Sequence, residues 1–292
     1  MIDTTSSSES DKMFVKTLSG IQMPKLIYGT AWKKDRTTDL VVQAVKAGFK
    51  GIDTACQPKH YSEAGVGAAL NKLADQGFPR EKLFVQTKFT GISGQDPKSI
   101  PYDKDAPLKT QIEQSLEVSL KNLGTSYVDS LVLHGPMRTE ERTLEAWKVL
   151  EGFINEGKVK QIGMSNCYSL PYFKKIYDNA TVKPSVLQNR FYAESGYDKK
   201  LRQFCKEKGI FYQAFWILTA NQHILGSTAV QKMAGKYDKT PAQCFYAFLM
   251  QTGVITPLTG TTSALHMKED LDAVNVELNE DEMRQFSKFV DG

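Results

Sequence analysis

Four side chains in the first half of the sequence could together deliver a proton to a carbonyl oxygen: Asp53, Tyr61, Lys88 and His134. A tyrosine whose pKa is about 10 is a weak acid at neutral pH. A lysine ammonium beside it favours the phenolate and lowers that pKa, and an aspartate orients the lysine. We therefore predict that Tyr61 is a general acid, and that His134 donates a second hydrogen bond to the same oxygen.

Such a site protonates oxygen, but it also needs a hydride for the carbonyl carbon. No amino-acid side chain supplies one, and a nicotinamide cofactor is the natural donor. The predicted reaction is therefore NAD(P)H-dependent reduction of aldehydes or ketones to alcohols. The expected partner is a small-molecule carbonyl compound.

The elements that carry these residues alternate between short apolar runs and longer amphipathic ones. In the amphipathic runs, apolar residues return every three or four positions, which is typical of helices. Apolar strands alternating with helices indicate a parallel sheet that is covered on both faces. Eight such units predict an α/β fold, a (β/α)₈ TIM barrel, with strands at 26–30, 50–54, 83–88, 128–134, 159–166, 185–189, 210–215 and 254–257.

The rest of the chain adds little to this barrel. The stretch FVKTLSGIQMP predicts an N-terminal β-hairpin with Ser19-Gly20 as its turn. No linker or change of composition interrupts residues 13–292, which we expect to form a single catalytic domain. Residues 1–12 are polar and rich in serine, unlike a secretory or transit peptide, and we interpret them as a disordered tail.

Polar residues stand at the ends of successive predicted strands, where barrels of this type carry their functional groups. Burying any one of them without a partner costs on the order of several kcal/mol. A single one could be a satisfied core residue, but five strand ends of this kind are better explained by one shared site. These strand-end residues are Asp53, Lys88, His134, Ser165-Asn166 and Gln188.

Seven motifs then occur in the order typical of the aldo-keto reductase superfamily, which the chain resembles from its hairpin to its end. They are GTAW (29–32), GFKGIDTA (48–55), LFVQTK (83–88), YVDSLVLHGP (127–136), IGMSN (162–166), SVLQN (185–189) and ITPLTGTT (255–262). The resemblance implies the same catalytic tetrad of Asp53, Tyr61, Lys88 and His134. It also implies nicotinamide contacts from Ser165, Asn166 and Gln188, from the ring of Phe215, and from the backbone near Gly29 and Thr30.

The tyrosine is one departure from the family pattern. The family usually places it five residues after the aspartate, where this chain has Pro58. We expect a loop three residues longer that still brings Tyr61 to the site. The alternative is that Tyr61 lies on the surface and that Tyr102, Tyr127 or a water supplies the proton.

The stretch GVGAAL that follows lacks the third glycine of a dinucleotide loop, so we expect its glycines to serve helix packing.

The cofactor's phosphate site is a second departure. Relatives commonly end the last strand in Pro-Lys-Ser, but here Leu258 replaces the lysine, with His266 and Asp270 near later arginine and asparagine positions. A helix N-terminus with free amides still suits a phosphate. The expected ligands are Thr259, Gly260, Thr261, His266 and Lys268. NADP is the expected cofactor on family grounds, with NAD possible.

The substrate's surroundings are expected to come from long loops and aromatic side chains. The segment 89–107 is the longest loop at a strand end, and we expect it to form part of the substrate wall. The candidates for substrate contact are Trp32, His60, Phe89 and Trp216. Packing alone could also explain the positions of the two tryptophans.

Composition narrows the remaining possibilities. The net charge of +4 is spread along the chain and predicts neither nucleic-acid nor membrane binding. The four cysteines (Cys56, Cys167, Cys205 and Cys244) lack metal-ligand spacing, so we expect no metal site and buried thiols in a reducing, cytoplasmic setting.

Two other functions stay open. One is a lyase that forms a Schiff base through Lys88, and the other is an NADPH-binding regulatory subunit with little turnover.

Overall fold

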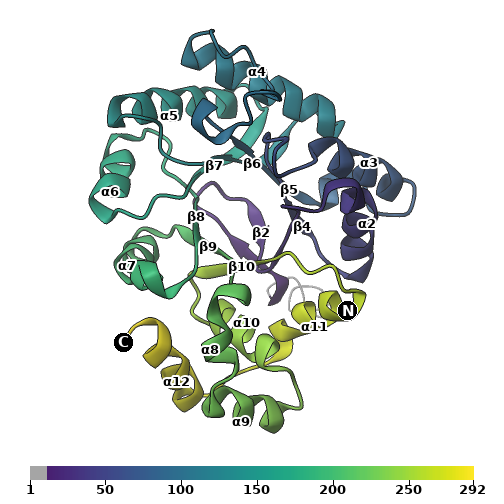
Figure 1. Cartoon of the computed structure of the whole chain (residues 1–292), viewed down its shortest axis with the longest axis vertical. Coiled ribbons are helices and arrows are strands. Elements are labelled where there is room, and N and C mark those ends of the chain that lie inside the picture. Colours follow the sequence, from purple (N-terminus) through teal and green to yellow (C-terminus); the bar gives the residue numbers. More distant parts are fainter. Residues whose placement is uncertain (1–11) are drawn as a thin grey trace, which may run out of the picture.

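A computed structural model describes residues 12–292 of the chain. Eight parallel strands close into a barrel with helices around it (Figure 1), in the order β10-β3-β4-β5-β6-β7-β8-β9. The predicted (β/α)₈ barrel is thereby confirmed. The predicted tail, residues 1–12, lies outside the described residues except for Lys12. The barrel strands are β3 (Ile27–Gly29), β4 (Gly51–Asp53), β5 (Phe84–Phe89), β6 (Val128–Leu133), β7 (Val159–Ser165), β8 (Val186–Arg190), β9 (Phe211–Phe215) and β10 (Ile255–Thr259).

Helices follow each barrel strand, and the connection from β9 to β10 and the C-terminal segment carry additional ones. Within residues 12–292, no helix has both the length and the apolar character needed to cross a bilayer. The helices are α2 (Thr37–Ala47), α3 (Glu63–Ala74), α4 (Leu108–Leu123), α5 (Glu140–Asn155), α6 (Leu170–Asn179), α7 (Lys199–Lys208), α8 (Gln222–Leu225), α9 (Thr228–Tyr237), α10 (Pro241–Gln251), α11 (Ala264–Asp272) and α12 (Glu280–Val290).

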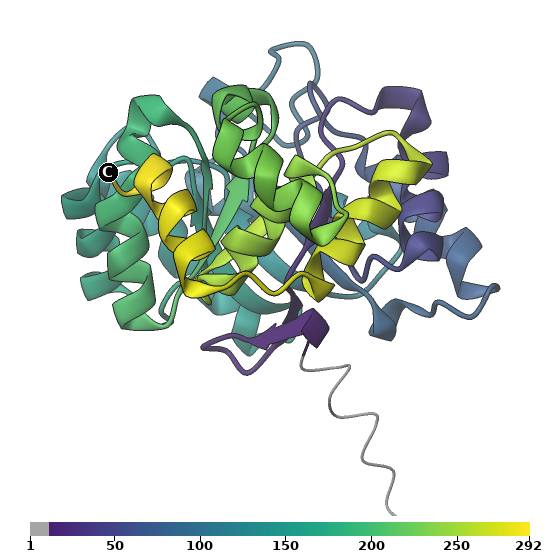
Figure 2. The same cartoon turned by 90° about the horizontal axis from the view of Figure 1, so that it is seen from below.

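The predicted N-terminal hairpin is present and lies against one end of the barrel (Figure 2). Its strands β1 (Phe14–Lys16) and β2 (Gln22–Pro24) pair antiparallel. Gly20 lies in the connection with φ of 78°, a left-handed conformation that glycine adopts without steric cost. Met23 of β2 is fully buried in one apolar cluster with Ile27 and other barrel residues. The hairpin therefore plugs this end of the barrel.

Strand β10 runs two residues further than predicted, to Thr259 instead of Pro257. The extension follows from pairing, because Leu258 and Thr259 lie opposite Ile27 and Tyr28 of β3. This pairing closes the barrel between its last and first strands.

A chain of polar side chains runs through the barrel interior from the hairpin toward Asp53. Thr17 Oγ1 donates to Gln161 Oε1 at 2.8 Å, and Gln161 Nε2 donates to Ser130 Oγ at 3.3 Å. Ser130 Oγ then donates to Gln86 Oε1 at 2.8 Å, and Gln86 Nε2 donates to Asp53 Oδ1 at 2.8 Å. Each of these buried groups has a partner, so the interior is polar without an unpaired group along this path.

Helix α3 packs closely on the end of α4 at the GVGAAL stretch. A Cβ atom at Gly67 would lie 1.9 Å from the carbonyl oxygen of Asn122. No side chain can be placed at that distance from a backbone atom. The expectation that these glycines serve helix packing is confirmed at Gly67.

We predict opposite effects on stability for two glycine-to-alanine substitutions in helices. Gly67→Ala should lower the free energy of unfolding by about 1–3 kcal/mol, because the added methyl group overpacks the contact with Asn122. Gly152→Ala in α5 meets nothing within 4 Å. It should raise stability by about 0.5–1 kcal/mol through a less flexible unfolded chain. Urea unfolding followed by circular dichroism measures both, and equal effects would contradict the packing argument.

Candidate active site

A buried ion pair lies at the centre of the site. Lys88 Nζ is 2.7 Å from Asp53 Oδ2, and the two side chains are 0% and 3% exposed. The same ammonium donates to the carbonyl oxygen of Thr54 at 3.0 Å and hydrogen-bonds with the Tyr61 hydroxyl. Burial alone lowers the pKa of Lys88, but the charge of Asp53 and the contact with Tyr61 outweigh it and leave that pKa above its ordinary value. Lys88 is therefore a charged lysine.

The other oxygen of the Asp53 carboxylate is held by two glutamines. Gln86 Nε2 and Gln188 Nε2 donate to Asp53 Oδ1 at 2.8 and 3.1 Å. Gln213 Oε1 accepts from the same two amides at 2.7 and 2.8 Å. The carboxylate thus has fixed donors on both oxygens, and it fixes the position of Lys88 in turn.

Tyr61 reaches Lys88 from the loop between β4 and α3. Its backbone amide donates to the carbonyl oxygen of Gln57 at 3.0 Å. Two residues after Tyr61, the Glu63 carboxylate accepts a hydrogen bond from the Thr87 hydroxyl at 2.5 Å. Thr87 directly precedes Lys88 in the sequence. The loop that carries Tyr61 is therefore tied to β5 just after the tyrosine. The Lys88 ammonium lies 4.8 Å from the centre of the Tyr61 ring.

The pKa of Tyr61 differs in direction from the sequence-based expectation. Burial raises it most, Lys88 lowers it and Asp53 raises it, and the net pKa lies above the ordinary value of a tyrosine. The predicted lowering by Lys88 is present but smaller than the effect of burial. The phenol is therefore protonated at neutral pH, the state that a proton donor requires.

His134 lies beside Tyr61 at the end of β6. The two ring centres are 6.0 Å apart in an edge-to-face arrangement, and His134 Nδ1 is 2.6 Å from Thr90 Oγ1. Burial, then the charges of Lys88 and His60, hold the pKa of His134 well below its ordinary value. The imidazole is therefore neutral at physiological pH.

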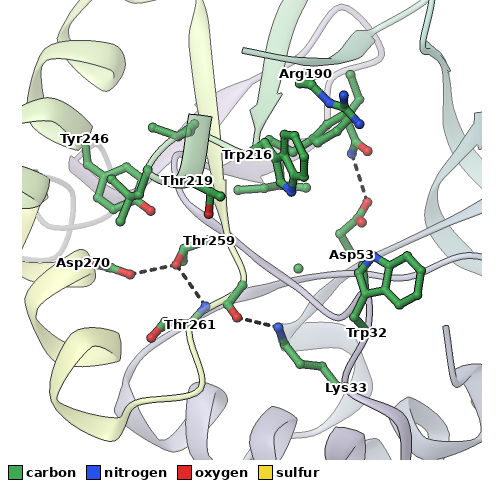
Figure 3. A pocket seen from close by; sticks show the side chains of 18 of the residues that line it. Trp32, Lys33, Asp53, Arg190, Trp216, Thr219, Tyr246, Thr259, Thr261 and Asp270 are labelled. Atoms are coloured by element: carbon green, nitrogen blue, oxygen red, sulfur yellow. Dashed lines mark hydrogen bonds between the residues drawn. The ribbon is translucent and has the colours of Figure 1, made fainter. Parts of the chain in front are cut away.

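A cavity of about 790 Å³ opens above this group and extends to β10 and α11 (Figure 3). Its volume falls within the roughly 300–1,000 Å³ of small-molecule sites. Most of the predicted site residues line it, while Lys88 lies buried beneath. The predicted residues on its walls are Asp53, Tyr61 and His134; Gly29, Asn166, Gln188, Phe215, Thr259, Gly260, Thr261 and His266; and Trp32, His60 and Trp216.

Four other predicted contact residues, Phe89, Thr30, Ser165 and Lys268, are not among the residues that line this cavity. Phe89 is buried with its ring 5.5 Å from that of Tyr102, on the opposite strand face from Lys88. The buried hydroxyls of Thr30 and Ser165 donate to the carbonyl oxygens of Asp53 and Gln188, each at 2.8 Å. Lys268 is exposed on α11, where the helical period turns it away from the face shared by residues 266, 269 and 270.

Several cavity residues were not predicted. Lys33 directly follows GTAW and donates a hydrogen bond to the carbonyl oxygen of Gly260. Arg190 comes two residues after Gln188, so the period of a strand could have placed it on the same face. Residues 217–219 and Tyr246 of α10 also line the cavity, but no sequence signal marks them as part of it.

The end of the cavity near α11 contains the Asp270 carboxyl group. Thr259 Oγ1 donates to Asp270 Oδ2 at 2.8 Å (Figure 3). Burial raises the pKa of Asp270 to about 6. This end of the cavity therefore offers a carboxyl group where relatives commonly have an asparagine.

Strained backbone gathers on the cavity walls. Trp32, Asn166 and Trp216 have φ angles of 63°, 51° and 63°. Such left-handed conformations are uncommon for residues other than glycine and cluster at functional sites. The two tryptophans are 65% and 52% exposed, and the Trp32 ring lies 3.9 Å from that of His60. Two indole rings are thus held open to solvent at the edge of the cavity.

The cysteines near the site are inert by burial. All four cysteines are buried and free. Burial raises the pKa of both Cys56 and Cys167 to about 12, so neither thiol is ionised at neutral pH. The prediction of buried core thiols is confirmed.

Comparison with known proteins places this barrel in a family. The Aldo/keto reductase family profile matches residues 25–291. The chain therefore belongs to the aldo/keto reductase family, whose members are oxidoreductases. It is 27% identical over 271 residues to the glyoxal reductase of Bacillus subtilis, covering 92% of this chain and 90% of that protein. It is 26% identical over 276 residues to the methylglyoxal reductase DkgA of Yersinia pestis, covering 94% and 91%.

Solved structures show the same similarity. An aldo/keto reductase from Brucella melitensis matches with a TM-score of 0.80 and 27% identity, covering 94% of this chain and 98% of that one. A variant of Gox0644 in complex with NADPH matches with a TM-score of 0.77 and 25% identity, covering 94% and 92%. The fold of this chain is thus shared along nearly the whole of these proteins.

We predict that the buried ion pair is strongly coupled. Lys88→Met should destabilise the fold by about 3–5 kcal/mol, because it leaves the Asp53 carboxylate buried without its counter-ion. The double variant Asp53→Asn/Lys88→Met should recover part of that loss, since it removes the stranded charge as well. A double-mutant cycle in urea unfolding gives the coupling energy. Additive losses would mean that the two groups do not depend on each other.

Proposed function

We propose that this protein reduces aldehydes or ketones to alcohols with NADPH, and that Tyr61 is the general acid. The observation that carries the proposal is the Tyr61 hydroxyl hydrogen-bonded with the charged Lys88 at the base of an open cavity. A protonated phenol with a cation behind it is a proton donor whose conjugate base is stabilised as it forms. The family membership of the chain and its similarity to the glyoxal reductase and the methylglyoxal reductase support the same reaction class.

The cavity fits a nicotinamide dinucleotide. Asn166 and Gln188 offer amides at the catalytic end, and the Phe215 side chain lines the wall beside them. At the other end, Gly260 offers a close approach to the backbone, with Thr261 beside it. We propose that the nicotinamide lies at the first end and the phosphates pass Gly260. The NADPH complex of a Gox0644 variant favours NADP as the cofactor, and NAD remains compatible with Leu258 in place of a lysine.

When bound, the cofactor supplies a hydride to the carbonyl carbon. Tyr61 gives its hydroxyl proton to the carbonyl oxygen in the same event, so that an alcohol forms, and the Lys88 ammonium stabilises the phenolate left behind. Solvent then returns a proton to Tyr61. Asp53 keeps Lys88 in place and takes no part in the proton transfer.

His134 orients the carbonyl through a hydrogen bond from Nε2. The Thr90 hydroxyl lies 2.6 Å from Nδ1. When that hydroxyl donates, Nδ1 is the acceptor and the ring hydrogen must be on Nε2, toward the cavity. In that arrangement Thr90 is a positioning residue that sets the tautomer of His134. The sequence did not mark it.

A Schiff-base lyase is less compatible with this site. A Schiff base requires a neutral amine that touches the substrate. The Lys88 side chain is 0% exposed and paired with Asp53, and its pKa lies above the ordinary value. A regulatory subunit with little turnover would keep the same cavity, so steady-state NADPH consumption with a panel of aldehydes, ketones and dicarbonyls separates it from the proposed enzyme.

As part of the same proposal, residues 13–292 act as one catalytic domain in the cytoplasm. The barrel and the helices around it share one apolar core. The four cysteines lie buried as free thiols, the state that a reducing compartment maintains.

We predict that Tyr61→Phe lowers kcat for carbonyl reduction by roughly 10²–10⁴-fold, the span for loss of a general acid. The dissociation constant for NADPH should hardly change, because the phenol acts on the substrate oxygen. Tyr127→Phe is the matched control, since Tyr127 lies just before β6, at the opposite end of that strand from His134. Steady-state kinetics and calorimetry measure the two effects. Near-normal turnover of Tyr61→Phe would assign the proton to another donor.

The pH profile of reduction follows from two pKa directions. The raised pKa of Tyr61 keeps the phenol protonated until the pH passes that value, and the lowered pKa of His134 keeps the imidazole neutral down to acidic pH. We therefore predict that kcat for reduction is flat from about pH 6 to about pH 9, between the ordinary ranges of the two groups. Alcohol oxidation should rise toward alkaline pH, because it needs the phenolate. A fall in the reduction rate centred near neutral pH would contradict this assignment.

A further inference from the structure

Arg190 is a cation without a counter-ion on the wall of the active-site cavity. It is the last residue of β8, half-buried, and lines the cavity two residues after Gln188. Its guanidinium carbon lies 4.1 Å from the centre of the Trp216 ring and 5.3 Å from that of Tyr192. Among residues 12–292, no carboxylate lies within ion-pair distance of it. The indole holds the guanidinium in place while its donors stay free for a ligand.

The other cations around the cavity have partners. Lys88 is paired with Asp53 beneath the cavity, and Lys33 donates to the carbonyl oxygen of Gly260. A guanidinium that is partly removed from water needs a replacement for its lost hydration. An anion with two neighbouring oxygens, such as a phosphate, can replace this hydration by accepting two parallel hydrogen bonds from the guanidinium. The missing partner of Arg190 is therefore expected to be part of a ligand.

The position of Arg190 indicates which ligand it binds. The side chains that perform the proposed proton transfer come from β4, β5, β6 and the loop after β4. Arg190 lies on the other side of the barrel, on β8, against Trp216 just after β9. In Figure 3, Arg190 and Trp216 lie on one side of the cavity and Lys33 on the other. Asp53 at the catalytic end and Gly260 and Thr261 at the other end line this same cavity.

We propose that Arg190 binds the pyrophosphate of the dinucleotide, opposite Lys33. This inference rests on the proposed function, which places the nicotinamide beside Gln188 and the phosphates near Gly260. It makes Arg190 a cofactor residue that serves NADPH and NADH alike, because both carry the pyrophosphate. It also gives the Trp216 indole a role, which is to orient the guanidinium.

Two variants separate charge from packing. Arg190→Met keeps a long side chain against Trp216 and removes the charge, whereas Arg190→Lys keeps the charge and loses the fork. The dissociation constants of NADPH, NADH and ADP-ribose are measured by calorimetry at several salt concentrations, with thermal unfolding of each variant. Arg190→Met should weaken all three ligands by a similar factor of about 10- to 100-fold, as expected for a lost charge-assisted hydrogen bond. It should also flatten the salt dependence of binding, and Arg190→Lys should bind at intermediate strength.

The outcomes distinguish this inference from the proposed function. If the wild-type protein binds neither NADPH nor NADH, the proposed function itself fails. If the wild type binds both and Arg190→Met binds them equally well, only the role of Arg190 is wrong. A KM that rises for 4-carboxybenzaldehyde but not for 4-nitrobenzaldehyde, with unchanged cofactor affinity, would assign Arg190 to an anionic substrate and overturn the proposal. A lowered melting temperature with an unchanged salt dependence would assign it to packing and overturn it as well.

Discussion

The structure of the site depends on one buried ion pair between neighbouring strands. Removing two charges from water costs several kcal/mol per ion, and a pair repays that cost only with good geometry and further hydrogen bonds. Here Asp53 and Gln86 are paired residues in the register of β4 and β5, so Lys88, two residues further along β5, lies just above the carboxylate. The two glutamine amides and the Thr54 carbonyl complete the partners. A slip of one residue between these strands would turn Lys88 out of the barrel.

The position of Tyr61 follows from the outer face of the same strand. Alternation along β5 directs Lys88 inward and its neighbour Thr87 outward. Thr87 donates to Glu63 in the first turn of α3, and the Asn122 amide also donates to that carboxylate, at 3.4 Å. Helix α3 is therefore fixed to the outside of the strand that carries the lysine. Because this anchor comes after the tyrosine, the length of the loop before Tyr61 can vary without displacing α3.

The sequence predicted the barrel and the residues of its strand ends because both follow from simple periods. The same rule, applied strictly, would have excluded Phe89, which neighbours Lys88 and must face outward, and would have included Arg190 two residues beyond Gln188. The raised pKa of Tyr61 was not predictable from the sequence. The motifs identify Lys88 as a nearby charge, but they do not give the depth of burial, whose effect on the pKa is larger. Tyr246 and residues 217–219 line the cavity because α10 and the loop after β9 fold over the barrel. No period or motif in their local sequence indicates that position.

The charges along the cavity are divided in a way that suits the proposed chemistry. At the catalytic end, Asp53 and Lys88 cancel, while Tyr61 and His134 are neutral at physiological pH. This end therefore has little net charge and suits an uncharged carbonyl group, whose oxygen gains charge only as the reaction proceeds. The cations Lys33 and Arg190 line the part of the cavity that we propose for the phosphates, with Lys33 hydrogen-bonded to Gly260. An anionic cofactor is thus attracted along the cavity without placing a fixed charge beside the proton donor, so its binding does not disturb the neutral state of Tyr61 on which proton transfer depends.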